Sequence, residues 1–454
     1  METSTNNQQI VAYGSQEFHK EHGADIGKFL NFIPHQVYQI ACGGLHTLIL
    51  TTNREVYSFG SNKDWALGRI GNPKKPAKVE LNVPVDMISA GESHSIACDS
   101  NQSIIYQWGR YKYFNTKESP AQVTPGRIGE NEIKKKKIKK ILSGANHTLV
   151  LAEGKVYVWG EGQWGIFGRL PSSRRKTDSG LTVETLGVKG TVEDIFTGEN
   201  HAFLKKTETK KKETHSVILA WGYNYWGQLG IGSREKIIFN PTEVEALRDK
   251  NIENITGGNR HTLALTSEGE VFSFGMNDVG QLGLGKDLKP FEKEEESKEA
   301  AKSEETAQDT RIWSGLTPQK VELANVAKIF CGRDSNYAIT KDNEVYCWGL
   351  ADHNLLGPGI TESLFVPTKF GLENRQPVRQ IGLGKEHVVL LSGDTEVQLE
   401  EDGVNQAKKG TAAKKGKKKS QKDDDEEANE TRKVKLTPQI TEDPEKMEEE
   451  KSRE

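Results

Sequence analysis

One short motif constrains the fold of this chain more than any other feature, because Gly-x-x-His recurs along almost its whole length. The repeated histidines are His46, His94, His147, His201, His261 and His387. A seventh copy, CGRDSNYAITKDNEVYCWG, keeps the frame of the motif but has Ser335 at the histidine position. Such internal repetition indicates an architecture built from many similar supersecondary units.

Each copy has the pattern of the same set of short strands. An apolar stretch such as KKILSG precedes the histidine, an alternating run such as HTLVLAE contains it, and an aromatic run such as KVYVWG follows after a turn. Alternation of β-branched and aromatic residues predicts strands, and the 45 glycines of the 454-residue chain suit tight turns between them. One such sheet cannot bury both of its faces, whereas seven around an axis can. We therefore predict an all-β fold, a seven-bladed β-propeller.

The two ends of the repeat region are expected to join. The last copy, IGLGKEHVVLLSGDTEV, has no aromatic strand after it. Near the N-terminus, IVAYGSQEFHKEHGADIG (10–27) has the pattern of the second half of a unit that has no first half. We expect this N-terminal segment to complete the last blade and so to close the ring.

The repeated histidines do not predict a metal or catalytic centre. Each occupies the same place in a different blade, so the imidazoles are spread around an axis, and we expect each to hydrogen-bond the backbone of a neighbouring blade. The sequence has no Gly-x-Ser-x-Gly, no phosphate-binding glycine loop followed by Lys-Ser/Thr, and no His-Glu-x-x-His. We expect no metal, no cofactor and no bond-making chemistry.

The four cysteines contain no Cys-x-x-Cys pair, which argues against a disulfide framework or a zinc site. Cys42 and Cys331 each directly precede a repeat glycine, and we expect both to be small core residues in a reducing compartment. The N-terminal METSTNNQQI lacks the apolar core of a signal peptide, and no stretch approaches the length of a membrane span. We expect no membrane contact.

The units end in Trp-Gly or Phe-Gly, and the Trp-Asp dipeptide of the other common seven-bladed propeller is absent there. EVYSFGSNKDWALGR, KVEL, ISAGESHS and NYAITKDNEVYCWG resemble the repeats of the regulator of chromosome condensation family. The resemblance covers about Ile10 to Val397. It implies a propeller and the function of the founding member, a guanine-nucleotide exchange factor for the small GTPase Ran that docks on chromatin. Such a factor binds the nucleotide-free GTPase better than the loaded one and, by reciprocity, weakens nucleotide binding by the same factor.

The resemblance also implies which residues meet the GTPase on one face of the ring. Acidic contacts of the family fall on Glu17 and Glu92, and a third falls on Asn146, which carries no charge. A contact histidine of the family falls on Arg260, and the last contact histidine is kept as His387.

A wedge that pushes at the phosphate-binding region of the GTPase is implied after Trp108-Gly109, in RYKYFNTKE (110–118). This loop is shorter than the family's, and its tip departs from the family's Arg-Asp-Asn-Gly. The wedge residues here are Tyr111, Lys112, Tyr113, Phe114 and Asn115.

On the opposite face, the resemblance implies an arginine-bearing loop that docks on the acidic patch of the histone octamer in the nucleosome. Here the loop is GRLPSSRRKTDSG, which contains Arg169, Arg174, Arg175 and Lys176. Arginine suits bidentate recognition of carboxylates. An exposed basic loop without a partner is the alternative interpretation.

Familiar members of the family carry a basic N-terminal arm for DNA, which this sequence lacks. Nonspecific DNA contact is therefore assigned to the run KKKKIKK (Lys134–Lys140) and to lysines near the C-terminus. A solvated loop is the alternative interpretation of the lysine run.

Composition predicts three segments outside the propeller, which we assign to residues 10–399. Residues 1–9 are expected to be a short flexible N-terminus, and the acidic insertion 286–313 has few apolar residues and is expected to be disordered. The tail 400–454 runs from lysine-rich to acidic and is also expected to be disordered. Its basic cluster resembles a signal for an import receptor, with a solubilising tail as the alternative; the lysines are Lys414, Lys415, Lys417, Lys418 and Lys419.

Two other functions remain open from the sequence. The first is a non-enzymatic propeller scaffold, such as a ciliary or trafficking protein, which the altered wedge and Asn146 favour. The second is an architectural chromatin binder without exchange activity. The exchange factor is expected in the nucleus on chromatin, whereas a ciliary scaffold is expected at a ciliary base.

Overall fold

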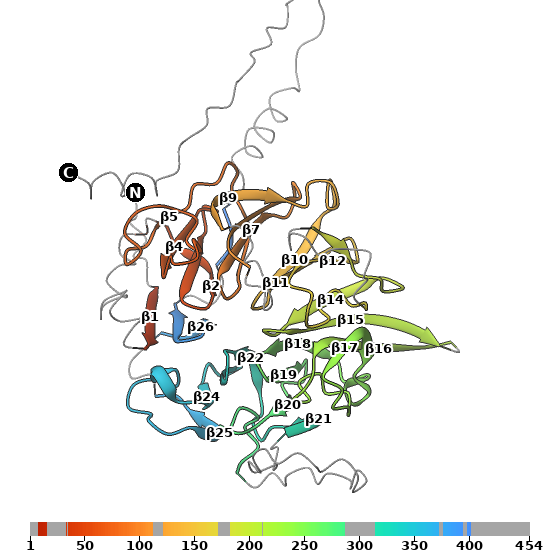
Figure 1. Ribbon diagram of the computed structural model, residues 1–454. Helices are drawn as coiled ribbons and strands as arrows, with labels where there is room; N and C mark the ends of the chain where they lie inside the picture. The colour runs from red at the N-terminus through yellow and green to blue at the C-terminus, as the bar shows by residue number, and fades with distance from the viewer. Residues whose placement is uncertain are drawn as a thin grey trace, which may run out of the picture. The chain divides into compact units, whose positions relative to one another are not determined.

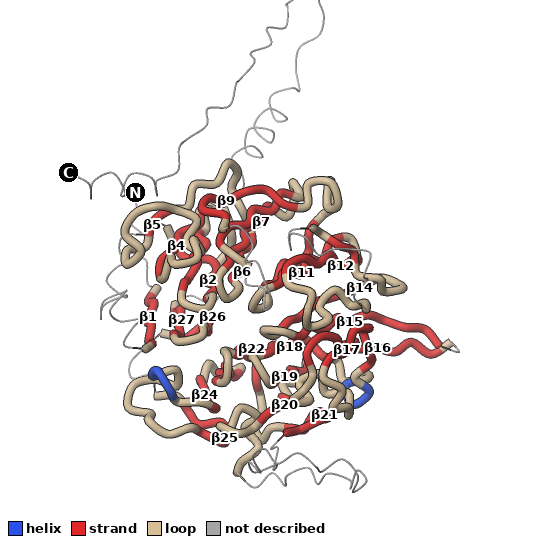
Figure 2. The backbone as a smooth tube through the Cα atoms, viewed as in Figure 1, coloured by secondary structure: helices blue, strands red, loops and turns tan. Residues whose placement is uncertain are grey.

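Seven small antiparallel sheets surround a common axis (Figure 1). The computed structural model describes residues 8–15, 33, 35–111, 121–170, 182–210, 212–286, 314–371, 376–393 and 397–400. Within them, six sheets have four strands and one has three. Figure 2 shows a chain made of strands and loops, and its helices in the described residues are the short 3-10 turns η2 (Glu245–Leu247) and η3 (Asp352–Asn354).

Each sheet forms one blade, and consecutive blades follow one another along the chain. Blades 1 to 3 consist of β2 (Val37–Cys42), β3 (His46–Thr51), β4 (Val56–Gly60) and β5 (Ala77–Lys78); β6 (Met87–Ala90), β7 (His94–Asp99), β8 (Ile104–Gly109) and β9 (Gln122–Ile128); and β10 (Ile138–Ser143), β11 (His147–Ala152), β12 (Lys155–Gly160) and β13 (Glu184–Thr185).

The remaining blades follow the same scheme, with a longer central hairpin in blade 4. Blades 4 to 7 consist of β14 (Val192–Thr197), β15 (His201–Lys210), β16 (Glu213–Tyr223) and β17 (Ile237–Glu243); β18 (Ile252–Gly257), β19 (His261–Thr266), β20 (Val271–Met276) and β21 (Ser314–Lys320); β22 (Val326–Cys331), β23 (Ser335–Thr340), β24 (Val345–Gly349) and β25 (Leu364–Lys369); and β26 (Val378–Leu383), β27 (His387–Ser392) and β1 (Gln9–Gly14).

The first strand of each blade lies at the axis, where it neighbours the first strand of the next blade all the way round. Six of these inner strands carry a one-residue bulge at the same place; the residues skipped are Tyr38, Lys139, Glu193, Glu253, Ala327 and Arg379. A bulge bends a strand and increases its twist, which helps short inner strands to follow the curvature of the ring. The predicted seven-bladed propeller is confirmed.

The N-terminal strand closes the ring, as the sequence predicts. β1 pairs antiparallel with β27, from Gln9 opposite Ser392 to Gly14 opposite His387. Blade 7 therefore takes its third strand from the other end of the described propeller. Without β1, the edge of β27 would be left unpaired, and an unpaired edge favours association with other chains.

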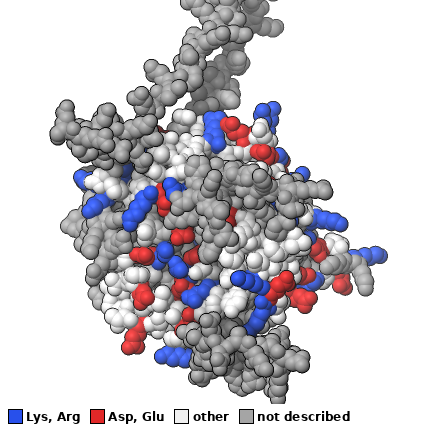
Figure 3. Space-filling model, in the orientation of Figure 1, with Lys and Arg blue, Asp and Glu red and all other residues white. Residues whose placement is uncertain are grey.

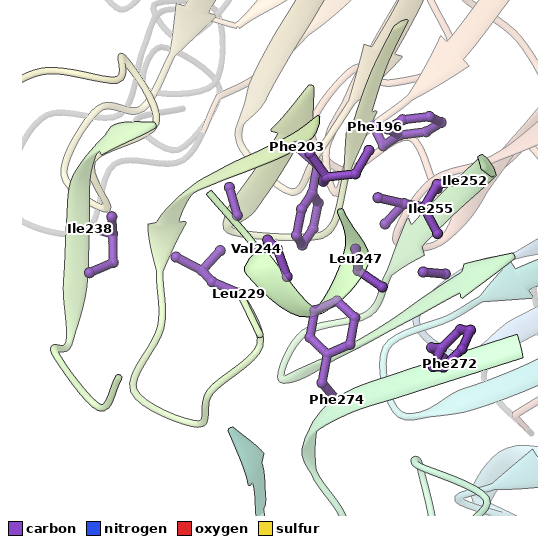
Figure 4. Close-up of a cluster of buried hydrophobic side chains, with 13 residues drawn as sticks. Phe196, Phe203, Leu229, Ile238, Val244, Leu247, Ile252, Ile255, Phe272 and Phe274 are labelled. Carbon is purple, nitrogen blue, oxygen red and sulfur yellow. The ribbon is translucent and has the colours of Figure 1, made fainter. Parts of the chain in front are cut away.

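The hydrophobic core is divided into seven clusters, each lying between two successive blades. Figure 4 shows the cluster between blades 4 and 5, where Phe196 and Phe203 face Phe272 and Phe274. The rings of Phe203 and Phe274 meet edge to face with centroids 6.1 Å apart. Because burying a phenylalanine contributes roughly 1.5–3 kcal/mol, each interface between blades is itself a sizeable apolar core.

All four cysteines are free thiols. Cys42 and Cys331 are partly buried: each packs against a core cluster, as predicted, and also lines a pocket at the axis. Among the described residues, no helix combines the length and apolar character needed to cross a bilayer.

Several predicted segments lie outside the described residues. These are residues 1–7, residues 287–313 of the acidic insertion, and residues 401–454 of the tail, which contain the five lysines of the predicted import signal. The contacts of the chain separate it into two units, residues 1–400 and 401–454. The boundaries that we assign to the segments remain predictions.

Candidate functional site

The strand register gives the propeller two distinct faces. In blade 3, His147 pairs with Gly160, so the turn before β11 and the loop after β12 lie at the same end of the sheet. The same pairing joins His46 to Gly60, His94 to Gly109, His201 to Gly222 and His261 to Gly275. We call this end the histidine face and the other end the opposite face. The seven turns that bring the chain from the first to the second strand are the axial turns: 43–45, 91–93, 144–146, 198–200, 258–260, 332–334 and 384–386.

The Gly-x-x-His motif has a simple steric cause. A Cβ atom added at Gly43, Gly91 or Gly144 would lie 2.0–2.2 Å from Cε1 of the histidine three residues on. The imidazole therefore occupies the space that any larger residue would need, so the axial turns can keep this path only with glycine at that position.

Each repeat histidine joins its blade to the next one. His46 Nε2 lies 2.8 Å from Ser95 Oγ, His201 Nε2 2.8 Å from Thr262 Oγ1, and His387 Nε2 3.0 Å from Thr47 Oγ1. The partner is thus a side chain, usually the residue directly after the next repeat histidine, and the expectation of a backbone partner is wrong. His261 shows the direction of the bond, because Asn336 Oδ1, 2.7 Å away, can only accept.

Burial keeps these histidines neutral. It lowers the pKa of His46 to about 4 and the pKa values of His147 and His201 to about 3. A neutral imidazole that donates through Nε2 to a neighbouring blade serves as a link in the scaffold. Among the described residues, no group of three or more His, Cys, Asp or Glu side chains is arranged to hold a metal ion.

The junction between blades 6 and 7 differs from the other six. Blade 7 has Val388 directly after its repeat histidine, and blade 6 has Ser335 in place of the histidine. Blade 4 also lacks a polar group there, at Ala202, but its Thr197 lies 2.9 Å from His147 Nε2, whereas blade 7 has Leu383 at the position of Thr197. The Ser335 hydroxyl is buried without a hydrogen-bond partner. A histidine here would have no acceptor at the usual position, which accounts for its absence from the seventh copy.

A ring of backbone hydrogen bonds connects the axial turns. Glu92 donates its amide to Ala145, Ala145 to Glu199 and Glu199 to Gly258, with N···O distances of 2.8–3.0 Å. Within the part of the chain that the structure describes, backbone hydrogen bonds of this kind also join the axial turns of blades 1 and 2, 5 and 6, and 7 and 1. In the same part of the chain, none joins those of blades 6 and 7. The axial turns are therefore held rigidly, which suits them to present side chains to a partner.

A pocket of about 260 Å³ opens where the axial turns converge. Its walls are mostly glycines and short side chains, but four charged residues also line it: Glu92, Glu199, Arg333 and Lys385. Lys385 Nζ lies 3.7 Å from a Glu92 carboxylate oxygen, and Arg333 Nε lies 3.8 Å from an Asp334 oxygen. The predicted site contained only Glu92 of these four. The first x of Gly-x-x-His is the signal that would have found Glu199, Arg333 and Lys385, since it falls at the axis in every blade.

Three of the described residues predicted to contact a GTPase lie on the axial turns, and the fourth, His387, begins the strand that follows one. Glu92 is one-third exposed and Asn146 is partly exposed. Arg260 lies 3.4 Å from Asp278 and 3.2 Å from Asp334, and its guanidinium stands over the ring of Trp226. His387 is fully buried, so its imidazole would touch a partner only if the turn above it opened. Glu17 lies outside the described residues.

The predicted wedge begins on the same face, beside the axial turn of blade 2. The Arg110 amide donates to Ser93 O at 2.8 Å. Tyr111 is buried; its hydroxyl bonds Gln107 and Thr148, accepts from Trp159 Nε1 at 2.9 Å, and its ring stacks on His94. Tyr111 therefore anchors the loop and does not form its tip. Lys112, Tyr113, Phe114 and Asn115 lie outside the described residues.

The predicted histone loop leaves blade 3 from the histidine face. Its first residue after β12, Glu161, donates its amide to Asn146 O at 2.7 Å, on the axial turn. The described start of the loop therefore lies on the same face as Asn146, and the expectation of opposite faces is wrong for this part. The sequence does not show that the loop joins the third strand of a blade to its fourth, and such loops start at the end where the second strand begins. The face on which residues 171–181 lie stays a prediction.

Arg169, at the start of this loop, has a partner within its own blade. Its Nη2 lies 2.8 and 2.6 Å from the two carboxylate oxygens of Glu184, which begins β13. Arg69, at the same place in blade 1, is buried and donates to the carbonyl oxygens of Ser58 and Lys75. Arginine at this position therefore ties the loop to the blade. Arg174, Arg175 and Lys176 lie outside the described residues.

The lysine run 134–140 covers the end of the connection from β9 to β10 and the first three residues of β10, on the opposite face. Lys134, Lys135 and Lys137 are exposed, whereas Lys140 bonds Asp194 at 2.9 Å. The last described residue, Glu400, bonds Thr52 in the turn between β3 and β4, also on the opposite face. Basic and acidic side chains are interspersed over the described part of the face seen in Figure 3.

Comparison with known proteins agrees with this architecture. The RCC1-like domain family matches residues 13–390. The chain is 31% identical over 398 residues to the human regulator of chromosome condensation, covering 80% of this chain and 84% of that protein. It is 30% identical over 364 residues to protein pim1 of Schizosaccharomyces pombe, covering 73% of this chain and 62% of pim1.

The crystal structure of Prp20p from Saccharomyces cerevisiae, described with its binding properties to Gsp1p and histones, has the same fold. It superimposes with a TM-score of 0.72 at 24% identity and covers 90% of this chain and 96% of that one. The repeat, the closed ring and the family match together lead to one conclusion: the chain belongs to the RCC1-like domain family, which includes the regulator of chromosome condensation.

Proposed function

We propose that this protein is a guanine-nucleotide exchange factor for the small GTPase Ran and that the GTPase binds the histidine face. The observation that supports this most is that Glu92, Asn146, Arg260 and the anchored base of the predicted wedge share one face, on or beside the axial turns of blades 2, 3 and 5. Prp20p, which shares the fold, binds Gsp1p. A rigid surface with a protruding loop beside it has the parts that an exchange factor requires.

In this proposal the protein makes and breaks no covalent bond. The axial turns bind the GTPase, and the loop after Tyr111 enters its phosphate-binding region. Because Tyr111 is fixed by Gln107, Thr148 and Trp159, a push from the loop is transmitted to the blades. The protein then favours nucleotide-free Ran and lowers its affinity for GDP by the same factor.

The test is release of labelled GDP from Ran with the protein present in trace amounts. We expect each molecule of the protein to accelerate release from many molecules of Ran. An unchanged intrinsic rate, with circular dichroism showing a folded β protein, would reject the exchange function.

We further propose that the opposite face contacts chromatin in the nucleus. The exposed lysines of this face, together with the lysine-rich composition of residues 401–454, support nonspecific contact with DNA phosphates. Removing five charges by changing Lys414, Lys415, Lys417, Lys418 and Lys419 to alanine is expected to reduce import-receptor binding and nuclear accumulation.

Histone contact through Arg174 and Arg175 is proposed as a separate activity of the loop after Arg169. Because that loop begins on the histidine face, Ran and a nucleosome are expected to compete for the protein if both use it. Replacing both arginines with alanine should weaken nucleosome binding at constant salt concentration. Unchanged affinity would remove the loop from the interface.

A non-enzymatic scaffold is the second candidate. Arg260 is already flanked by two carboxylates, and Asn146 carries no charge, so these two positions offer a partner less than a free charged pair would. A scaffold predicts binding of Ran or another partner without accelerated GDP release.

A further inference from the structure

The axial pocket contains one charged group without a partner. Lys385 is close to Glu92 and Arg333 is close to Asp334, each within 4 Å. Among the described residues, the Glu199 side chain has neither a hydrogen bond nor an ion pair, although it lines the same pocket. Glu199 is partly exposed, and an ionised carboxylate that is partly removed from water without a partner loses some of its hydration.

The surroundings of Glu199 explain its ionisation. Burial raises the pKa of Glu199 to about 7; Arg333 and Lys385 oppose this rise, while Glu92 and Asp334 add to it. The neighbouring axial turns contribute Ala145 and Asn146 on one side and Asn259 and Arg260 on the other, and Arg260 is directed to Asp278 and Asp334. Near neutral pH, the Glu199 side chain therefore changes between a neutral and an anionic form, and among the described residues the anionic form has no cation within ion-pair distance.

The size and position of the pocket limit what would compensate that charge. About 260 Å³ is enough for one long side chain but not for a folded element, and the pocket opens at the centre of the proposed GTPase-binding face. Each of its two cations has a carboxylate within 4 Å, so Glu199 is the charged group of the pocket that has no oppositely charged neighbour at that distance. A single basic side chain fits both the space and the missing charge.

We propose that the axial pocket receives one lysine or arginine side chain of the bound GTPase and that Glu199 is its ion-pair partner. This assignment rests on the proposed function and deepens it, since it names the chemistry recognised at the centre of the face. A partner that covers the axis excludes water from the pocket, which strengthens the pair.

The proposal is tested with Glu199→Gln, which keeps the shape and removes the charge. At pH 8, binding of the variant to nucleotide-free Ran should be roughly tenfold to a hundredfold weaker than that of the wild type. As pH falls from 8 to 6, the wild-type carboxyl takes up a proton, so wild-type affinity should fall toward that of the variant, whose own affinity stays nearly constant. The matched control is Glu153→Gln, in the turn between β11 and β12 on the opposite face, with wild-type affinity expected.

Thermal stability gives a second readout. If Glu199 served only to stabilise the fold, its replacement would lower the unfolding temperature. The folded pKa of Glu199 is above its unfolded value, so this group favours folding at low pH and loses that contribution as pH rises toward 7. Free Glu199→Gln should therefore unfold at an equal or higher temperature than the wild type at pH 8, while binding Ran less well.

Equal affinity of Glu199→Gln and wild type for Ran at pH 8 would overturn the assignment alone, as would a lower unfolding temperature of the variant. A folded wild type that does not bind Ran at any pH would overturn the proposed function, and the assignment with it. The two failures are therefore distinguishable.

Discussion

The two outer residues of the Gly-x-x-His motif and its two inner residues serve different purposes, although they are adjacent in the chain. The glycine and the histidine are buried against each other and bind one blade to the next. The inner residues are, for example, Glu92 and Ser93 in blade 2, Ala145 and Asn146 in blade 3, and Glu199 and Asn200 in blade 4. The first set is constant because the scaffold requires it, and the second is free to vary because it lies at the surface around the axis.

Acid should have the largest effect on stability, and it should act through the buried histidines of the motif. The pKa values of His46, His147 and His201 are lowered in the folded protein, so the unfolded chain binds more protons below pH 6.5 and stability falls as pH decreases toward 4. Glu199 has the opposite sign and offsets part of the loss. We expect a net loss of roughly 4 kcal/mol between pH 6.5 and pH 5, measured by urea unfolding. A flat profile would contradict neutral, buried histidines.

Filling the space beside one histidine should have the next largest effect. A Cβ atom in Gly144→Ala would lie 2.1 Å from His147 Cε1 and 2.7 Å from Gly198 O, so side chain and backbone must both move. We expect a loss of about 3 kcal/mol in denaturant unfolding. Gly187→Ala is the control, since nothing lies within 4 Å of its added Cβ, and it should unfold like the wild type.

Removing a histidine link should cost less, and only where a link exists. His387→Ala loses the bond to Thr47 and leaves a cavity, with an expected loss of about 2 kcal/mol. Ser335→Ala at the junction of blades 6 and 7 removes a hydroxyl that has no partner, and we expect a change within about 0.5 kcal/mol. Equal losses in thermal unfolding for both variants would show that the junctions do not differ as described.

Arg169→Ala should have the smallest effect. Its pair with Glu184 is one-third exposed on the arginine side, and exposed pairs contribute about 0.2–1 kcal/mol. We expect a slightly lower unfolding temperature and unchanged nucleosome binding. A strong loss of nucleosome binding at wild-type stability would assign Arg169 to the interface after all.

The sequence predicted the blades and their closure because strand alternation and a repeated frame are local signals. It did not predict which loops start on the same face, since that depends on strand order and register within each sheet, and so the base of the loop that contains Arg169 was not expected beside Asn146. Nor did it predict that Tyr111, a residue of the wedge, is the buried anchor of that loop, because its hydroxyl bonds Gln107, Thr148 and Trp159 from other parts of the chain. The pocket around Glu199 needs residues from distant repeats, and no single copy reveals it.

The central claim is that the inner residues of the motif, on the histidine face, bind a GTPase and promote nucleotide release. The most direct measurement is catalysed GDP release from Ran by the wild type, by Glu92→Ala on the histidine face, and by Lys134→Ala/Lys135→Ala on the opposite face. We predict fast release by the wild type, release about tenfold slower with Glu92→Ala, and wild-type release with the lysine variant. Release that is unaffected by Glu92→Ala but reduced by the lysine variant would contradict the account.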